Sequence, residues 1–358
     1  MRPCLVLNDF NGGGAERLVK DLAIELETLD DVSPVVVVSN ERGELRSEFE
    51  ESGIEYSTLG IDVSIRSVPN GVRKLTDHLR ALNPDVIHSH LAFSDLISRV
   101  ACMRLSLPHV STYHNVAEKR SRLKRGVERS TRRLSDRIVC VSDGVRQSYG
   151  DDPRMCVIYN AIDVEGFNRR VAEADLTEIP DRIRSAETVY LNVGRCVEVK
   201  RQWDLVEAMK RRDSSTEQLV IVGDGPLRPE LEALVSEEGL SDRVTVTGFV
   251  DSVVPYFAAA DVFVSSSSKE GLPTTHIEAM AAELPIVSTD IPGVREIVED
   301  GTTGYLCPVG EAGKLAATME RAKADGQSLG SRGFETASST FSIEKIATDH
   351  AKLYRETA

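Results

Sequence analysis

The chain has 358 residues, of which 41% are hydrophobic, and this is enough for two domains of ordinary size that each have a core. The formal net charge of -14 argues against a nucleic-acid partner. No run approaches the roughly 20 apolar residues of a membrane span, and the first residues lack the regions of a signal peptide, so we expect a cytoplasmic protein.

The first half of the chain predicts a parallel sheet covered by helices on both faces. Apolar runs alternate with amphipathic segments, which is typical of strands that are buried on both sides. We expect strands at residues 4–9, 34–39, 85–90, 109–114, 137–142 and 155–160. The segment 160–187 is polar and has no clear apolar period, which favours a linker.

The second half repeats this alternation. We expect strands at residues 188–194, 218–223, 243–248, 261–266, 285–290 and 303–308. An amphipathic helix follows at residues 342–356. The pattern predicts an α/β protein with two Rossmann-like, doubly wound parallel-sheet domains at residues 1–168 and 169–341, and the final helix packs across them or back onto the first.

Loops at the carboxyl ends of the strands carry the functional signals, because ligands bind there in open parallel sheets. Three glycines at residues 12–14 follow the first strand, where they let the backbone approach a ligand and use positive φ, or simply make a tight turn. His114 comes just after residues 110–113 of a predicted strand. It is either a structural residue or a ligand-binding one. His88 and His90 look like strand-end structure.

A strongly basic segment follows His114. Nine Lys or Arg and two acidic residues fall between Lys119 and Arg137, both included. Leu123, Val127 and Leu134 recur at helical spacing, which predicts a helix with a thin apolar stripe and cationic flanks. Such a helix is either a solvated surface or a patch for anionic lipid headgroups or a phosphate-bearing acceptor.

Two cations follow the first strand of the second half. Arg195 and Lys200 are separated by four residues, so both could pair with a diphosphate, Arg through its planar fork and Lys as a mobile charge. A solvated surface pair is the alternative. Phe249 and Val250 follow a later strand, where their backbone could contact a base.

Two carboxylates flank the predicted start of a helix. Glu270 and Glu278 are separated by seven residues, and Pro273 between them suits the first helical turn. The amino end of a helix suits a diphosphate, and an ionised glutamate can accept hydrogen bonds from two neighbouring sugar hydroxyls. Alternatively, both carboxylates complement the helix dipole and face water.

Motifs along nearly the whole chain resemble those of the retaining, GT-B-fold glycosyltransferases of family 4. In order, they are GGGAER, STYHN, VIYNAIDVEGF, VGRCVEVK, VGDGP, TGFV, ADVFVSSSSKEGLPTTHIEAM and EDGTTGYL. The sequence departs from the family pattern at Glu283, where glycine is usual, and at Cys196 and Val197, which bears on fine specificity. The resemblance implies an N-terminal acceptor domain and a C-terminal donor domain that face a cleft.

The resemblance also implies a reaction: a sugar passes from a UDP- or GDP-sugar to a hydroxyl of a glycan or lipid-linked acceptor, with retention of configuration. His114 would bind a sugar hydroxyl near the reacting centre, Glu270 the donor sugar and Glu278 the ribose. Arg195 and Lys200 would neutralise the departing diphosphate. Further donor-binding residues implied are Gly13, Gly14, Phe249, Val250, Gly271, Leu272, Pro273 and Thr274.

We expect neither a metal nor a cofactor. The sequence contains no D-x-D pair, and its six cysteines are scattered without C-x-x-C spacing. Two alternatives to a glycosyltransferase stay open. One is a nucleotide-sugar epimerase of the same fold, and the other is a non-catalytic subunit that binds the donor.

Overall fold

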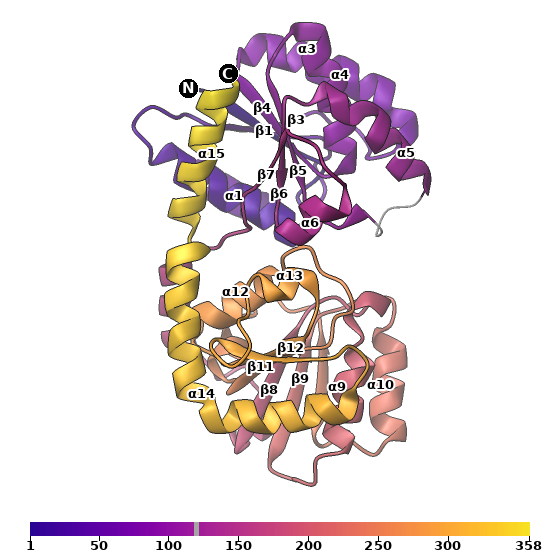
Figure 1. The fold of residues 1–358 in the computed structure, drawn as a ribbon, viewed down its shortest axis with the longest axis vertical. Coiled ribbons are helices and arrows are strands. Elements are labelled where there is room, and N and C mark those ends of the chain that lie inside the picture. Colours follow the sequence, from indigo (N-terminus) through magenta and orange to yellow (C-terminus); the bar gives the residue numbers. More distant parts are fainter. Residues whose placement is uncertain (118–121) are drawn as a thin grey trace. The chain divides into compact units, whose positions relative to one another are not determined.

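The computed structural model describes residues 1–117 and 122–358. The chain divides into two compact units (Figure 1). The N-terminal unit comprises Met1–Ala161 and Ile343–Ala358, and the C-terminal unit comprises Ile162–Ser342. In the described residues, no helix combines the length and the hydrophobicity needed to cross a membrane.

Within its described residues, the N-terminal unit has a seven-stranded parallel sheet in the order β3-β2-β1-β4-β5-β6-β7. The strands are β1 (Pro3–Leu7), β2 (Val35–Val38), β3 (Tyr56–Thr58), β4 (Val86–His90), β5 (His109–Tyr113), β6 (Arg137–Cys140) and β7 (Met155–Val157). The helices are α1 (Gly14–Glu27), α2 (Arg46–Glu51), α3 (Val68–Leu82), α4 (Ala92–Leu105), α5 (Arg122–Thr131), α6 (Asp143–Ser148) and α15 (Ile343–Thr357). Short 3-10 turns occur at η1 (Ile65–Ser67) and η3 (Arg132–Leu134).

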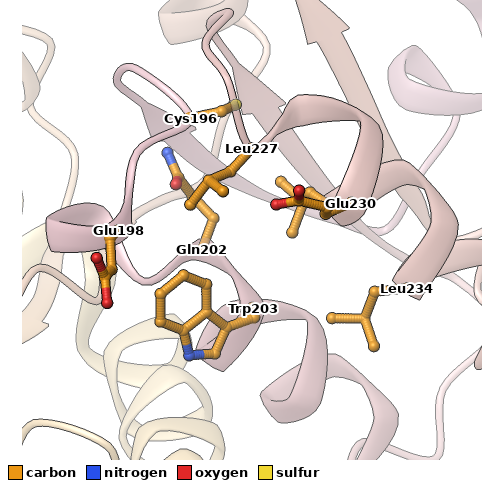
Figure 2. Close-up of a pocket in the computed structure, with 8 residues that line it drawn as sticks. Cys196, Glu198, Gln202, Trp203, Leu227, Glu230 and Leu234 are labelled. Atoms are coloured by element: carbon orange, nitrogen blue, oxygen red, sulfur yellow. The ribbon is translucent and has the colours of Figure 1, made fainter.

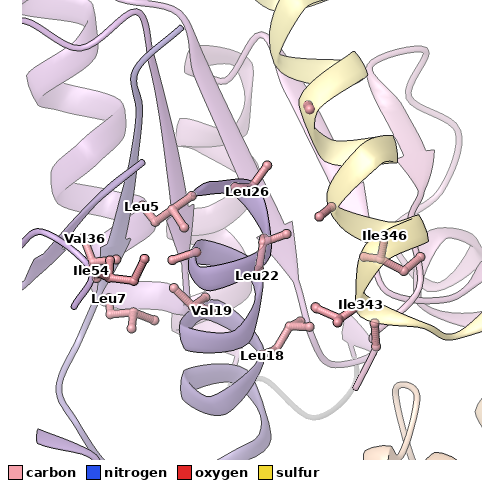
Figure 3. Packing of buried hydrophobic residues seen from close by; sticks show 14 of the residues in the cluster. Leu5, Leu7, Leu18, Val19, Leu22, Leu26, Val36, Ile54, Ile343 and Ile346 are labelled. Carbon is pink, nitrogen blue, oxygen red and sulfur yellow. The ribbon is translucent and has the colours of Figure 1, made fainter. Parts of the chain in front are cut away.

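The last helix of the chain completes the core of this unit. Figure 3 shows Leu22 and Leu26 of α1 between the strand residue Leu5 and the α15 residues Ile343 and Ile346, and all five side chains are buried. Full burial of one such side chain contributes about 1.5–3 kcal/mol. The amphipathic pattern of α15 is thus explained by its packing on α1.

The C-terminal unit has a six-stranded parallel sheet in the order β10-β9-β8-β11-β12-β13. The strands are β8 (Thr188–Val193), β9 (Glu217–Val222), β10 (Val244–Gly248), β11 (Val262–Ser265), β12 (Ile286–Thr289) and β13 (Gly304–Cys307). The helices are α7 (Val164–Ala172), α8 (Asp181–Arg184), α9 (Gln202–Lys210), α10 (Arg228–Glu237), α11 (Val254–Ala258), α12 (Thr274–Ala281), α13 (Pro292–Arg295) and α14 (Ala312–Thr340), and η4 (Glu198–Lys200) is a 3-10 turn.

Each sheet reverses its strand order once. In the N-terminal unit β1 pairs with β2 on one side and with β4 on the other, and in the C-terminal unit β8 pairs with β9 and β11. In open α/β sheets, ligands bind outside the carboxyl ends of the strands at such a reversal. The sheet topology therefore directs attention to the loops after β8 and β11.

The structure differs from the sequence-based expectations in four places. The short strand β3 was not expected, and the segment expected to be a linker contains α7 and α8. The boundary expected after residue 168 falls inside α7. Pro273 precedes α12 as its N-cap residue, with an extended ψ of 113°, rather than lying in the first turn.

Candidate functional site

Lys200 and Glu270 meet at the switch point of the C-terminal sheet. Lys200 ends η4 in the loop after β8, and Glu270 lies in the loop after β11. The Lys200 ammonium nitrogen lies 2.8 Å from Glu270 Oε1, and the two side chains are 24% and 10% exposed. The ion pair is thus partly withdrawn from water but still reachable by a ligand.

Serines past the end of β11 hold the Lys200 turn in place. Ser266 Oγ donates to the carbonyl oxygens of Lys200 at 2.9 Å and Arg201 at 2.8 Å. The backbone N–H of Ser268 donates to the carbonyl of Val199 at 2.8 Å. These bonds fix the turn to the strand that leads into Glu270, and the run of serines at residues 265–268 is the sequence signal for them.

The loops after β8 and β9 interlock through backbone contacts that require glycine. A Cβ on Gly223, which has φ +143°, would lie 2.2 Å from the carbonyl oxygen of Gly194. A Cβ on Gly225, with φ +158°, would lie 2.4 Å from the carbonyl oxygen of Cys196. Side chains at these positions would force the loops apart, so the glycines of VGDGP keep the Arg195 loop in place.

Other predicted donor ligands lie on the same unit. Arg195 is exposed in the loop after β8, and Phe249, 59% exposed, follows the end of β10 together with the half-buried Val250. Gly223 N–H donates to the carbonyl of Gly248 at 3.0 Å, which joins the loops after β9 and β10. These residues therefore belong to one edge of one sheet.

The predicted helix start carries the second carboxylate. Thr274 begins α12, no side chain of the described residues caps its amino end, and Glu278 lies half-buried in its second turn. Gly271, Leu272 and Pro273 before it are buried. An uncapped helix start offers N–H groups and the positive end of the dipole to an anion.

His276 of α12 is a neighbour of the Lys200–Glu270 ion pair, and it was not predicted from the sequence. Its side chain is 1% exposed, and Nε2 lies 2.9 Å from Ser288 Oγ. Burial lowers the pKa of His276 to about 3, against the opposing effect of Glu270 and with a small further lowering by Lys200. His276 is therefore a neutral side chain in the packing behind the Lys200–Glu270 ion pair.

A pocket of 370 Å³ lies beside α9 and α10 (Figure 2). Its walls are largely apolar and include Trp203, Leu227 and Leu234, with Glu198 and Glu230 at its margin. None of the predicted donor ligands lines it. The pocket adjoins the loop after β8 without coinciding with the Lys200–Glu270 ion pair.

The glycine loop of the N-terminal unit lies against the side chain of Glu16. Gly13 is the N-cap of α1 with φ −77°, and Gly14 is helical, so the positive φ expected for this loop is wrong at both. A Cβ on Gly13 would lie 2.5 Å from a carboxylate oxygen of Glu16. Burial raises the pKa of Glu16 to about 7, so this carboxyl group titrates near neutral pH.

His114 is half-buried just after β5 and contacts His90. His114 Nε2 lies 3.2 Å from Nδ1 of His90, whose ring packs against that of His88 at a centroid distance of 4.2 Å. The interpretation of His88 and His90 as mere strand-end structure is therefore incomplete. Both belong to the surroundings of His114.

The basic segment forms α5 and η3, although Lys119, Arg120 and Ser121 lie outside the described residues. The expected apolar stripe is wrong at Val127, which is 41% exposed. The buried face carries Glu128 instead, which accepts a hydrogen bond from the Tyr113 hydroxyl.

The basic side chains of this segment divide into two groups. Arg132 is 17% exposed and lies 3.6 Å from Asp152 and 3.8 Å from Glu128. Arg129 and Arg133, in contrast, are exposed. Among the side chains described between residues 126 and 137, Arg129 and Arg133 are thus the basic ones that are exposed.

Comparison with known proteins matches each unit to a family model. A model described as Glycosyltransferase Family 4 matches residues 12–165, and one described as Glycosyl transferases group 1 matches residues 187–325. The chain is 34% identical over 226 residues to the lipopolysaccharide core biosynthesis glycosyltransferase LpsE of Rhizobium meliloti (strain 1021), covering 62% of this chain and 64% of LpsE.

A second relative and a solved structure agree with these matches. The chain is 30% identical over 203 residues to N-acetyl-alpha-D-glucosaminyl L-malate synthase of Bacillus anthracis, covering 55% of this chain and 52% of the synthase. It thus spans between half and two thirds of the length of these two relatives. The structure of Anabaena HepE in complex with UDP-glucose is similar with a TM-score of 0.86 at 20% identity, over 99% of this chain and 100% of HepE.

The fold and the matches to known proteins classify this protein. Two parallel-sheet α/β units with polar and charged loops at the carboxyl ends of their strands make it a protein of the GT-B fold. Over the matched residues, the N-terminal unit is similar to the glycosyltransferases of family 4 and the C-terminal unit to those of group 1.

Proposed function

We propose that the protein transfers a sugar from a nucleotide diphosphate sugar, with UDP or GDP as the nucleotide, to a hydroxyl of a glycan or lipid-linked acceptor in polysaccharide or glycoconjugate synthesis. The observation that carries the proposal is the Lys200–Glu270 ion pair at the switch point of the C-terminal sheet. The names of LpsE and of the UDP-glucose complex of HepE support a nucleotide-sugar donor and a glycan product.

Charge neutralisation is the first part of the proposed mechanism. Negative charge builds on the diphosphate as its bond to the sugar breaks, and preorganised cations stabilise that charge. Lys200 is held by the Ser266 bonds to its turn, and Arg195 leaves the same loop with an exposed side chain. The amino end of α12 contributes its dipole. Lys200, Arg195 and the amino end of α12 together can balance the negative charge of the diphosphate. We therefore propose transfer without a metal ion.

Donor recognition is the second part. Glu270 accepts hydrogen bonds from hydroxyls of the donor sugar, and Glu278 from those of the ribose, since an ionised carboxylate accepts only. When the diphosphate arrives, Lys200 exchanges part of its interaction with Glu270 for the phosphate oxygens. Glu270 is thereby freed to orient the sugar.

Retention of configuration is the third part. No carboxylate has been assigned as a nucleophile, so we propose that the acceptor hydroxyl attacks on the face that the diphosphate leaves, with a phosphate oxygen taking its proton. The C1–O bond to the diphosphate breaks as the new C1–O bond forms. His114 binds a hydroxyl of the transferred sugar.

The proposed acceptor is tied to the N-terminal unit. A membrane-bound, lipid-linked acceptor would be reached if Arg129 and Arg133 bind anionic headgroups, as basic surface helices do. We therefore propose a peripheral association with the inner face of the membrane.

The experiment is a turnover assay of UDP-, GDP- and ADP-sugars with a library of glycan and lipid-linked acceptors. We expect nucleotide diphosphate release that depends on acceptor, with a product whose anomeric proton coupling matches that of the donor. Epimerised sugar without acceptor would instead identify an epimerase. Donor binding without turnover against any acceptor would identify a binding subunit.

A further inference from the structure

Four histidines gather at the carboxyl edge of the N-terminal sheet. His88 and His90 come from β4, His114 follows β5, and His350 comes from α15. The ring centroids of His88 and His90 are 4.2 Å apart, those of His90 and His114 5.4 Å, and those of His88 and His350 5.2 Å. All four belong to one unit of the fold.

His90 and His114 share a hydrogen bond in which one nitrogen must donate. His90 Nδ1 and His114 Nε2 are 3.2 Å apart. Burial lowers the pKa of His90 well below its ordinary value, and the neighbouring His114 and His350 lower it further, so the ring is neutral. A neutral imidazole carries a single N–H. The site of that proton on His90 therefore decides the direction of the bond.

The surroundings of His90 favour one direction. Its other nitrogen, Nε2, is buried and has no hydrogen-bond partner among the described residues. A proton there would be a buried N–H without an acceptor, and such orphaned donors are rarer in proteins than unsatisfied acceptors. The proton therefore sits on Nδ1, which donates to His114 Nε2.

We infer that His90 is a positioning residue that fixes His114 as its Nδ1–H tautomer. His114 Nε2 is then occupied as an acceptor and cannot take a proton from a sugar hydroxyl. His114 acts as a hydrogen-bond donor through Nδ1–H, toward an oxygen of the transferred sugar, rather than as a general base. The inference about the sugar rests on the proposed function, whereas the tautomer does not.

The ring of His90 is supported from behind by α15. His88, which packs on it, has Nδ1 2.6 Å from the Tyr354 hydroxyl and Nε2 2.6 Å from Thr112 Oγ1. Tyr354 is fully buried, and its ring lies 5.8 Å from that of His350. Two partners on different elements thus hold His88 and leave His90 little freedom to rotate.

The direct test is a long-range ¹H–¹⁵N spectrum of the ¹⁵N-histidine-labelled protein, with His114 assigned by the loss of its signals in His114→Gln. We expect a protonated Nδ1 and an unprotonated Nε2 for His114 in the wild type. A protonated Nε2 would overturn the inference. This measurement needs neither donor nor acceptor, so it stands even if the protein transfers no sugar.

Variants extend the test to turnover. His90→Asn keeps an N–H near the Nδ1 position and should retain the His114 spectrum and most of kcat. His90→Leu should mix the tautomers and lower kcat about tenfold with little change in the KM for the donor, because one hydrogen bond is misplaced.

The matched control is His109→Leu, which removes an equally buried histidine of the same sheet that contacts Ser135 and Ser89 instead. It should leave the His114 signals unchanged. Equal effects of the two leucine variants on the spectrum and on kcat would contradict a positioning role. If His90→Leu does not fold, the wild-type spectrum and His90→Asn still decide.

Discussion

At the scale of the residue, the ammonium nitrogen of Lys200 lies 2.8 Å from Glu270 Oε1. We expect Lys200→Ala to lower kcat about 100- to 1,000-fold, because removing one preorganised group that stabilises developing negative charge costs that much. The measurement is single-turnover release of nucleotide diphosphate at saturating donor. The control is Lys210→Ala, which removes a lysine paired with Glu238 in the same unit. Equal rates for both variants would refute the assignment.

The sequence could predict the donor-site residues singly but not their pairing. Arg195, Lys200 and Glu270 each follow a predicted strand, so their place at a sheet edge follows from the pattern of apolar runs. The ion pair depends on β8 lying beside β11, which a local pattern does not specify. The contact of His90 with His114 was not predictable, because a histidine at the end of an apolar strand looks like strand-end structure.

At the scale of the element, α14 packs so closely on the turn at Glu283 that one glycine is required. A Cβ on Gly330 would lie 1.9 Å from the carbonyl oxygen of Glu283, whereas one on Gly326 would meet only Pro285 at 3.6 Å. We expect Gly330→Ala to lower the free energy of unfolding by about 1–3 kcal/mol through overpacking. Gly326→Ala should raise it by about 0.5–1 kcal/mol. Urea unfolding of both variants checks this, and equal shifts would contradict the packing.

The exposed arginines of α5 and η3 carry the prediction of membrane binding. We expect Arg129→Glu with Arg133→Glu to weaken binding to vesicles that contain anionic lipid by about 2 kcal/mol or more, since each basic residue near such a surface contributes about 1 kcal/mol. Arg132 is not substituted in this variant, because it forms ion pairs within the N-terminal unit. Vesicle sedimentation is the measurement.

The matched control reverses Arg73 and Arg80 of α3, which are 65% and 61% exposed. It should bind vesicles like the wild type. If the α5 variant also binds like the wild type, the basic helix is a solvated surface and the acceptor reaches the enzyme in another way.

Helices and strands with a strong apolar period were predictable, and those without one were not. The predicted apolar runs contain β8 and β10 to β13, and they miss only Glu217 of β9, because strands covered on both faces are rich in apolar residues. β3 has three half-buried residues, Tyr56–Thr58, and gives no such run. The apolar stripe expected for α5 failed at Val127, because this helix packs through polar contacts of Glu128 and Thr131.

At the scale of the whole molecule, buried neutral histidines make the N-terminal unit the more acid-sensitive one. Burial lowers the pKa of His109 and His350 to about 3, and that of His88 and His90 well below the ordinary value. In the unfolded chain these side chains bind protons below about pH 6.5, so each lowers the free energy of unfolding by about 1.4 kcal/mol per pH unit from there toward its folded pKa.

Other groups modify this prediction without reversing it. Glu16, whose pKa is raised to about 7, keeps its proton when folded and adds stability as the pH falls from about 7 to its unfolded value near 4.5. The C-terminal unit has one comparable histidine, His276. Trp203, the single tryptophan of the chain, reports on that unit. On acidification below pH 6.5, circular dichroism should therefore change before Trp203 fluorescence, and the reverse order would contradict this view.

The two units and the GT-B fold could be predicted from the sequence, since the apolar runs form two sets and the motifs follow the family's order. Residues 343–358 belong to the first unit because Ile343 and Ile346 complete its core beside α1. The amphipathic period of this helix signalled burial but left its partner open. Only the three-dimensional structure identifies α1 as that partner.

The central claim is that the C-terminal unit binds a nucleotide diphosphate sugar through the Lys200–Glu270 pair and Glu278. The most direct measurement is the thermal shift that UDP-, GDP- and ADP-sugars cause in the wild type, in Glu278→Gln and in Glu207→Gln, a control on α9. We predict that sugars of one nucleotide raise the Tm of the wild type and of Glu207→Gln, and that Glu278→Gln loses most of the shift. No shift with any nucleotide sugar, or an equal shift in all three proteins, would contradict the account.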